Sequence, residues 1–279
     1  MGHSRNIAGS RMLITGASQG IGRSIALEAI KQGARVLAAA RQQPLLDELA
    51  AEVKAAGGTI ETVAADVTSP ADRQKMVDAA REKFGGLDIL INNAGIGSTG
   101  HYSEVEFDHL RKIFEVNFFG LTETTRAFLP MLKQGVKPAV VNIGSIAGKR
   151  GIPARSHYAS SKFAVQGFSE AIRAELAKDG IDVLIVNPGL TQTNFSKNMI
   201  EQKAKVQLDH MRGMTSEDVA LATLQSIANG TNEKTLTLNG KLLVLVSKFL
   251  PRLADMISKK KVRSLFTEEM AERRAQRGQ

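Results

Sequence analysis

The stretch RMLITGASQGIG, residues 11–22, decides the fold of this chain. Five residues typical of a short buried strand come first, a turn with three glycines follows, and a helical pattern then continues to about Gln32. Glycine lets a backbone approach a pyrophosphate closely, and the start of a helix offers free N–H groups and a positive dipole end. We therefore expect Gly16, Gly20 and Gly22 to cradle phosphates. The spacing differs from the common Gly-x-Gly-x-x-Gly, so an ordinary strand-to-helix turn is the alternative.

Strand and helix patterns alternate along the rest of the chain. Apolar strands are predicted at residues 34–39, 59–65, 87–91, 139–143 and 181–186, with an edge strand at 235–238. Helical patterns are predicted at residues 45–56, 70–84, 107–134, 158–178 and 215–230. The alternation predicts a single α/β domain, with a Rossmann-type, doubly wound parallel sheet of about seven strands and helices on both faces. Ligands of such sheets bind beyond the carboxyl ends of the strands.

Composition narrows the classes of protein that fit. The chain of 279 residues has no cysteine, which excludes a disulfide framework and a thiolate metal site, and we expect no metal. Residues 1–10 lack the apolar run of a secretory signal. These features predict a cytoplasmic protein.

Tyr158 and Lys162 are the residues on which we expect the chemistry to depend. They lie four apart, so on a helix they share one face, one turn apart. A phenol has a pKa of about 10, and a neighbouring ammonium group lowers it. Such a pair can give a proton to an oxygen or take one from it. Taken alone, Tyr-x-x-x-Lys is also common as a helix-start aromatic and a solvated lysine.

The end of the second predicted strand indicates which dinucleotide is bound. Many dinucleotide-binding folds carry an acid there for the ribose 2′-hydroxyl, but this chain reads Ala39-Ala40-Arg41. A guanidinium pairs well with a 2′-phosphate, so Arg41 favours NADP(H) over NAD(H), and Arg23 is expected to assist. The alternative for Arg41 is a solvated loop residue.

Together these features resemble the short-chain dehydrogenase/reductase family, in its NADP-preferring branch. The resemblance covers about residues 11–238, and five separated motifs carry it. They are Thr15-Gly16-x-x-x-Gly20-x-Gly22, Asp66-Val67, Asn92-Asn93-Ala94-Gly95, Ser145 with Tyr158-x-x-x-Lys162, and Pro188-Gly189-x-x-x-Thr193. One position departs from the branch: Gln19 stands where an Arg or Lys is common, so the NADP preference depends mainly on Arg41.

The resemblance implies roles for the matching residues. Tyr158 is the general acid of reduction and the base of oxidation, and Lys162 lowers its pKa and binds the nicotinamide ribose. Ser145 hydrogen-bonds the substrate oxygen, and Asn117 holds a water that links Lys162 to solvent. Asp66-Val67 meets the adenine, Asn93 the ribose region, and Thr193 the carboxamide and phosphates. The full set of expected cofactor-binding residues is Gly16, Ser18, Gln19, Gly20, Ile21, Gly22, Arg41, Asp66, Val67, Asn93, Ala94, Gly95, Tyr158, Lys162, Pro188, Gly189, Thr191 and Thr193.

The remainder of the chain divides into a lid and a basic extension. Residues 190–213 mix apolar and basic side chains, which suits a mobile lid within a catalytic domain spanning residues 1–240. Residues 241–279 hold ten Lys and Arg against four Asp and Glu, so they carry +6 of the formal charge of +9. Apolar residues recur there at helical spacing, with an interruption at Pro251. This amphipathic extension either packs on its own domain or a partner subunit, or contacts a membrane surface through residues 241–263. Nucleic acid has no supporting motif.

The leading function is an NADP(H)-dependent oxidoreductase that acts on CH–OH groups. It transfers a hydride between the nicotinamide and an apolar carbonyl or secondary alcohol, as a homodimer or homotetramer in keeping with the family. Two other functions stay open: a non-catalytic NADP-binding sensor or scaffold, and a membrane-surface interaction protein.

Overall fold

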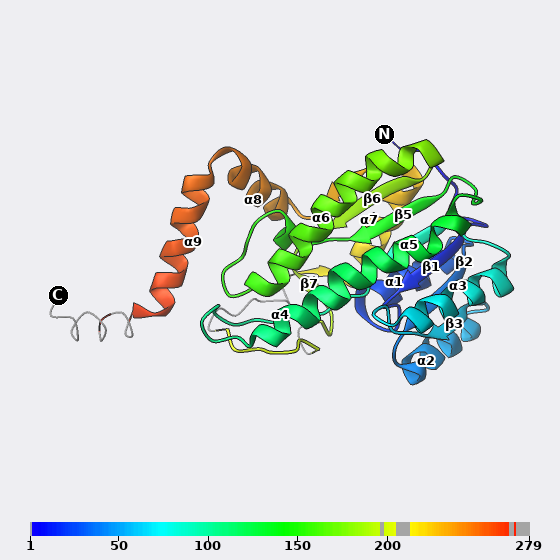
Figure 1. Cartoon of the computed structure of the whole chain (residues 1–279), viewed down its shortest axis with the longest axis horizontal. Coiled ribbons are helices and arrows are strands. Elements are labelled where there is room, and N and C mark those ends of the chain that lie inside the picture. Colours follow the sequence, from blue (N-terminus) through cyan, green and yellow to red (C-terminus); the bar gives the residue numbers. More distant parts are fainter. Residues whose placement is uncertain (1, 196–197, 205–212, 268–270, 272–279) are drawn as a thin grey trace.

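The computed structural model describes residues 2–195, 198–204, 213–267 and 271, which form a parallel sheet covered by helices on both faces (Figure 1). The sheet has seven strands in the order β3-β2-β1-β4-β5-β6-β9, all paired in parallel. The strands are β1 (Arg11–Thr15), β2 (Arg35–Ala40), β3 (Glu61–Ala64), β4 (Ile89–Asn92), β5 (Ala139–Ile143), β6 (Asp182–Asn187) and β9 (Glu233–Thr235); β7 (Thr191–Gln192) and β8 (Met214–Thr215) form a separate small sheet. The predicted fold class is confirmed.

Helices follow most of the strands of the large sheet. They are α1 (Gly20–Lys31), α2 (Gln43–Ala55), α3 (Pro70–Phe84), α4 (Phe107–Phe114), α5 (Leu121–Leu132), α6 (Ser156–Leu176), α7 (Ser216–Asn229), α8 (Leu238–Phe249) and α9 (Pro251–Leu265). Helix α5 lies on one face of the sheet and α7 on the other (Figure 1). The strands explain this double cover, because alternate side chains point to opposite faces. Met12 and Ile14 join the core beneath α1 and α7, while Leu13 joins the core beneath α3 and α5.

Most predicted elements have ends within about two residues of the observed ones, and two differ more. The predicted helix over residues 107–134 is interrupted by a π-helical segment, Glu115–Gly120, between α4 and α5. The predicted edge strand at 235–238 instead spans Glu233–Thr235, and it does lie at the sheet edge. Thr237 accounts for the shift, because its side chain accepts a hydrogen bond from Gly240 N and so starts α8 at Leu238.

The extension forms the two helices α8 and α9, which project from the body of the molecule (Figure 1). Their break at Leu250 and Pro251 matches the predicted interruption. Among the described residues, no helix is long and apolar enough to cross a bilayer. The division into a domain of residues 1–240 and an extension of residues 241–279 stays a prediction.

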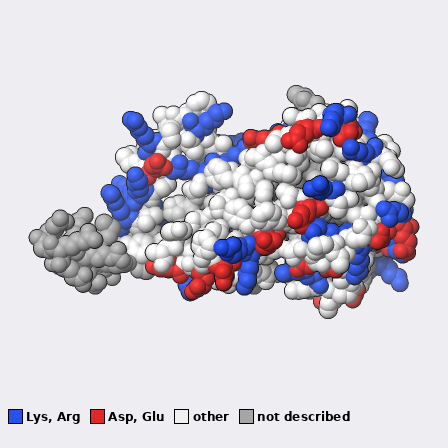
Figure 2. Space-filling view, in the orientation of Figure 1, with Lys and Arg blue, Asp and Glu red and all other residues white. Residues whose placement is uncertain are grey.

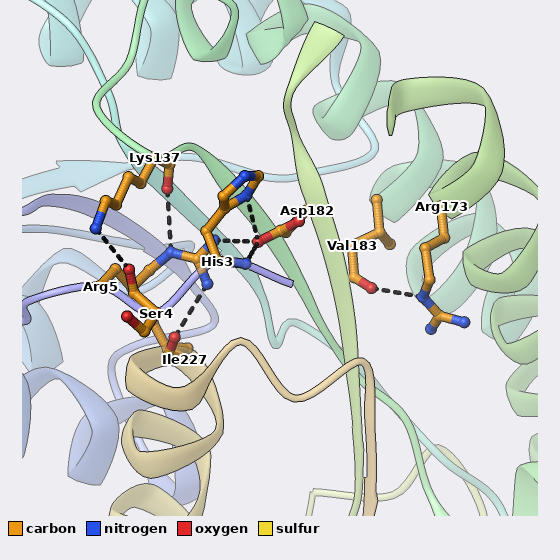
Figure 3. A network of polar contacts seen from close by, with 8 residues as sticks. All are labelled: His3, Ser4, Arg5, Lys137, Arg173, Asp182, Val183 and Ile227. Atoms are coloured by element: carbon orange, nitrogen blue, oxygen red, sulfur yellow. Dashed lines mark hydrogen bonds and ion pairs between the residues drawn. The ribbon is translucent and has the colours of Figure 1, made fainter. Parts of the chain in front are cut away.

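The segment before β1 is tied to the sheet by an ion pair between the buried Arg5 and the half-buried Asp182 (Figure 3). Arg5 Nη2 lies 2.5 Å from Asp182 Oδ2, at the start of β6. The same guanidinium donates from Nε to the Lys137 carbonyl and from Nη1 to the Ile227 carbonyl, both at 3.0 Å. The His3 backbone N–H also donates to Asp182 Oδ2, at 2.6 Å. One arginine therefore links the N-terminal segment, the loop before β5, the start of β6 and the end of α7.

We expect Arg5→Ala to lower the free energy of unfolding by about 2–4 kcal/mol, because it removes the cation that pairs with Asp182 and three hydrogen bonds from a buried guanidinium. Urea unfolding followed by circular dichroism measures this change. Arg81→Ala is the matched control, since Arg81 is exposed and, among the described residues, pairs only with its helical neighbour Asp78. This variant should cost at most about 0.5 kcal/mol. Equal losses for the two variants would contradict the structural role of Arg5.

Candidate active site

A cleft of about 1160 Å³ lies at the carboxyl ends of the parallel strands and contains nearly all the predicted site residues. Those that line it are Gly16, Ser18, Gln19, Gly20, Ile21, Arg41, Asp66, Val67, Asn93, Ala94, Gly95, Ser145, Tyr158, Lys162, Pro188, Gly189, Thr191 and Thr193. Gly22 and Asn117 do not line it. Gly22 has a packing function instead, because a Cβ there would overlap both the Asn93 side chain and the Gly16 carbonyl.

The glycine turn is held in place by residues at the ends of β1 and β4. The Thr15 hydroxyl accepts from the backbone N–H groups of Asn93 and Ala94, both at 3.1 Å. Asn93 Nδ2 donates to the carbonyls of Thr15 and Gly16, at 3.0 and 3.1 Å. Gly16 has φ +65°, and a Cβ there would lie 2.8 Å from Ala94 Cα. These hydrogen bonds hold the ends of β1 and β4 together. The side chain of Asn93, which is expected in the ribose region, donates its Nδ2 hydrogens to the glycine turn.

The first turn of α1 meets the requirements for an anion. Gln19 precedes the helix and makes no side-chain cap, and the first turn has no acidic residue. Gln19 and Gly20 line the cleft, so the start of α1 faces it. Free backbone N–H groups at a helix start, together with the helix dipole, favour a phosphate there. The chain therefore fits a dinucleotide at this end of the cleft, with Gly16 and Gly20 giving the backbone room to approach it.

Two arginines predicted to lie near the cofactor have different surroundings. Arg41 follows β2 directly, is exposed and lines the cleft. It makes no hydrogen bond or ion pair with any residue that the structure describes. Arg23 is instead engaged by Glu52 of α2 in an ion pair and does not line the cleft. The expectation that Arg23 assists Arg41 is therefore wrong.

Lys162 is buried one helical turn after Tyr158, on α6. Its Nζ donates to the Ile143 carbonyl at the end of β5, at 2.9 Å, and lies 5.9 Å from the centre of the Tyr158 ring. Burial lowers the pKa of Lys162 to about 8, because the charged ammonium form loses its hydration. The strand end thus holds an amine that can change protonation state close to neutral pH.

The pKa of Tyr158 differs from the predicted direction. Burial in the cleft wall raises it, while a hydrogen bond from Ser145 and the charge of Arg155 act in the opposite direction. The expectation that Lys162 lowers this pKa is therefore wrong for this structure, in which the cation acting on the phenol is Arg155. A raised pKa keeps the phenol protonated at neutral pH, which suits a proton donor.

Arg155 and Phe195 are cleft residues that the sequence did not indicate. Arg155 directly precedes α6 and is buried, and burial lowers its own pKa. Phe195 places its ring 5.7 Å from the Tyr158 ring. Both line the cleft, and no spacing pattern marks either one, because loop residues reach the site only through tertiary folding. Other apolar residues that line the cleft are Ile146, Ile152, Leu190, Met214, Leu238 and Leu243.

Asn117 lies behind the cleft in the π-helical segment. Its Oδ1 accepts from Ile96 N at 2.8 Å, and its Nδ2 donates to the Ile96 carbonyl and to Ser161 Oγ, both at 3.0 Å. These bonds join the segment after β4 to α6, so the residue acts first as a structural link. A water held by Asn117 would have to use an oxygen, because both amide hydrogens are already donated.

Part of the predicted lid is anchored beside the cleft. Asn198 Nδ2 donates to Gln19 Oε1 at 3.1 Å, and the backbone N–H of Lys203 donates to the Thr99 carbonyl at 2.8 Å. Glu201 is buried and pairs with His109 at 3.0 Å. Residues 196–197 and 205–212 of the predicted lid lie outside the described residues, and its mobility stays a prediction.

Comparison with known proteins agrees with this geometry. Residues 10–204 match the family model described as short chain dehydrogenase, and the chain belongs to that family. It is 35% identical to the "Uncharacterized oxidoreductase YxnA" of Bacillus subtilis, over 89% of this chain and 71% of that protein. It is 32% identical to the "Ketoacyl reductase HetN" of a Nostoc species, over 90% and 88%.

A solved structure extends the likeness to three dimensions. A short chain dehydrogenase/reductase from Burkholderia phymatum in complex with NAD superposes with a TM-score of 0.82, at 26% identity, and the alignment covers 89% of this chain and 96% of that chain. The chain is thus an oxidoreductase of the short-chain dehydrogenase family, with a cleft suited to a nicotinamide cofactor.

Lys162→Met tests the burial of the amine through its pH dependence. Since folding lowers the pKa of Lys162 from 10.5 to about 8, the buried ammonium destabilises the folded state below pH 8. That penalty is about 3 kcal/mol and disappears as the pH rises from about 8 to 10.5. The variant's Tm, relative to wild type, should therefore be highest near neutral pH and should fall as the pH approaches 10.5, in thermal unfolding of the cofactor-free protein.

The same measurement on Lys31→Met provides the control, because Lys31 is an exposed residue of α1. The Ile143 carbonyl loses its donor in Lys162→Met at every pH, so the slope and not the absolute difference carries the information. A difference in Tm that does not change with pH would refute the burial of the charge.

Proposed function

We propose that the protein is an NADP(H)-dependent oxidoreductase that reduces an apolar carbonyl to a secondary alcohol. The observation that carries this proposal is the placement of Ser145, Tyr158 and Lys162 in one cleft with the glycine turn. The ketoacyl reductase among its relatives is in keeping with carbonyl chemistry. A cofactor bound in the cleft supplies the hydride in reduction and accepts it in oxidation.

The side chains of the cleft stabilise the developing charge and supply the proton. Ser145 and Tyr158 place two hydroxyl donors on one side of the cleft, where they stabilise charge that develops on a carbonyl oxygen. Tyr158 then gives its Oη proton to that oxygen, so hydride and proton together convert the carbonyl into an alcohol. The resulting tyrosinate is stabilised by the charge of Arg155 until solvent returns the proton.

The direction of the Tyr158 pKa favours reduction near neutral pH. Burial keeps the phenol protonated there, which is the form that an acid requires. Oxidation needs the phenolate, and that form becomes populated only at more alkaline pH. Reduction is therefore the direction that the protonation state of the site supports.

The choice of NADP(H) over NAD(H) is supported by Arg41. The end of β2 has no carboxylate for a ribose 2′-hydroxyl, and Arg41 stands exposed on the cleft wall where a 2′-phosphate would be recognised. Gln19 supplies no charge and contacts Asn198, so Arg41 is the cation on which we base the preference. A homodimer or homotetramer, a cytoplasmic location and peripheral contact with a membrane remain part of the proposal.

Tyr158→Phe should lower the turnover of NADPH-dependent carbonyl reduction by about 10³-fold or more, because it removes only the donated proton. NADPH binding, measured by fluorescence titration, should change less than about 3-fold. Tyr102 is the only other tyrosine and is exposed, so Tyr102→Phe is the matched control and should keep full turnover. Substantial turnover in Tyr158→Phe would refute the acid role.

Arg41→Ala should raise the KM for NADPH by about 10- to 100-fold and leave the KM for NADH within about 2-fold, because only the phosphate loses its partner. Steady-state kinetics with both cofactors measure the ratio. Arg23→Ala should leave that ratio unchanged, since Arg23 is engaged by Glu52. Equal use of NADH and NADPH by the wild type would overturn the cofactor preference.

A further inference from the structure

Helix α8 presents one face to the cleft and the opposite face outward. Gly240 is buried against Ile146, and Leu243 lines the cleft. The other face carries Leu242 (59% exposed), Leu245 (56%) and Phe249 (67%), which follow one another at spacings of three and four residues. A continuous exposed apolar stripe of this kind marks an interaction surface. We call it the outer stripe.

Helix α9 also has exposed apolar side chains, while other residues of the helix hold it to the body of the molecule. Ala254 is buried, and Asp255 Oδ1 lies 2.5 Å from Arg150 Nη2. Beyond the helix, the Phe266 ring meets the His101 ring edge-on at 4.5 Å. The exposed apolar side chains of α9 are Leu253, Met256 and Ile257. The two helices are therefore fixed to the molecule and still leave an apolar surface uncovered by the residues that the structure describes.

The charge around this surface has one sign. Figure 2 shows Lys and Arg side chains over α8 and α9, separated by surface that carries no charge. Residues 238–265 contain seven basic residues and one acidic residue, Asp255, which is engaged by Arg150. The basic residues, all exposed, are Lys241, Lys248, Arg252, Lys259, Lys260, Lys261 and Arg263. An exposed apolar stripe flanked by cations matches a bilayer surface with anionic headgroups.

A second copy of the chain fits this surface less well. A symmetric contact between two outer stripes would bring Lys241 and Lys248 of both copies together, and like charges in one contact are repulsive. An anionic bilayer instead offers acyl chains to the stripe and headgroups to the lysines. Neither helix is long and apolar enough to span the bilayer, so the described helices would lie on its surface.

We propose that α8 and α9 dock on an anionic bilayer surface through the outer stripe, and that the cleft takes a lipid-dissolved carbonyl substrate from that bilayer. The loading of substrate from the bilayer follows from the two faces of α8. When Leu242 on the outer stripe contacts the bilayer, Leu243 on the other face of the same helix lines the cleft, so the cleft lies directly behind the docked helix. This loading of substrate rests on the proposed carbonyl reduction, whereas the docking on the bilayer does not.

The docking can be measured without any turnover, because the chain contains no tryptophan. Phe249→Trp places a single fluorophore on the outer stripe, and Leu221→Trp places one at an exposed apolar position of α7. Vesicles of phosphatidylcholine with about one third phosphatidylglycerol, carrying brominated acyl chains, should quench the indole of Phe249→Trp strongly and that of Leu221→Trp hardly at all. Equal quenching, or none in either variant, would overturn the docking.

Charge reversal tests the headgroup contribution. Lys248→Glu with Lys260→Glu should weaken binding to the anionic vesicles by at least about 10-fold in co-sedimentation, given about 1 kcal/mol for each basic residue near such a surface. Lys54→Glu with Lys112→Glu makes the same charge change at exposed positions of α2 and α4, and should change binding less than about 3-fold. An equal effect of the two pairs would show that net charge alone attracts the protein, and would overturn the assigned surface.

The loading of substrate is tested with two carbonyl compounds, a short water-soluble ketone and a long-chain ketone dissolved in the vesicles. Leu245→Ser with Phe249→Ser should reduce NADPH oxidation with the vesicle-dissolved ketone by about 10-fold or more and leave the soluble ketone unchanged. An equal loss with both ketones would overturn loading from the bilayer. No turnover of either ketone by the wild type would overturn the carbonyl-reductase proposal and the loading, while quenching of the Phe249→Trp fluorescence would still support the docking.

The oligomeric state tests whether a second copy of the chain, and not a bilayer, covers the outer stripe. Sedimentation equilibrium without lipid should show the same mass for wild type and for Leu245→Ser with Phe249→Ser. A dimer that dissociates in this variant would mean that a second copy covers the outer stripe, and would overturn docking on the bilayer.

Discussion

Burial of the Lys162 ammonium at the end of β5 is the constraint on which the rest of the site depends. The group donates to the Ile143 carbonyl, and its low hydration holds its pKa near 8. The same low-polarity environment raises the pKa of Tyr158. A buried amine and a half-buried phenol one helical turn apart are costly in free energy for the cofactor-free protein. Such a cost is typical of functional sites, where the arrangement is maintained by the surrounding structure.

The surrounding structure maintains it through bonds between strand ends and helices. Thr15 and Asn93 lock the glycine turn to the end of β4, and Asn117 joins the segment after β4 to Ser161 on α6. The site thus lies between elements that are all cross-linked at the same edge of the sheet. A parallel sheet makes this possible, because its strands deliver their carboxyl ends to one edge.

Helix α8 connects that edge to the exterior. Gly240 and Leu243 face the cleft, whereas Leu242 and Phe249 are exposed on the opposite side of the same helix. The cleft and the outer stripe therefore lie on opposite sides of one helix, so a surface that binds the stripe is held close to the cleft. The docking that we propose makes use of this single two-sided element.

The sequence by itself determined the sheet, its helices and a set of site residues of which nearly all line the cleft. Local sequence patterns were sufficient there, because the glycine turn after the first strand and the residues at the strand ends lie at the ligand-binding edge of any doubly wound sheet. It did not predict that Arg155 and Phe195 lie beside Tyr158, that Arg23 is engaged by Glu52, or that the pKa of Tyr158 is raised. Only the tertiary structure decided these points. Desolvation and charge proximity depend on which loops and helices close around a side chain, and no spacing along the chain records that.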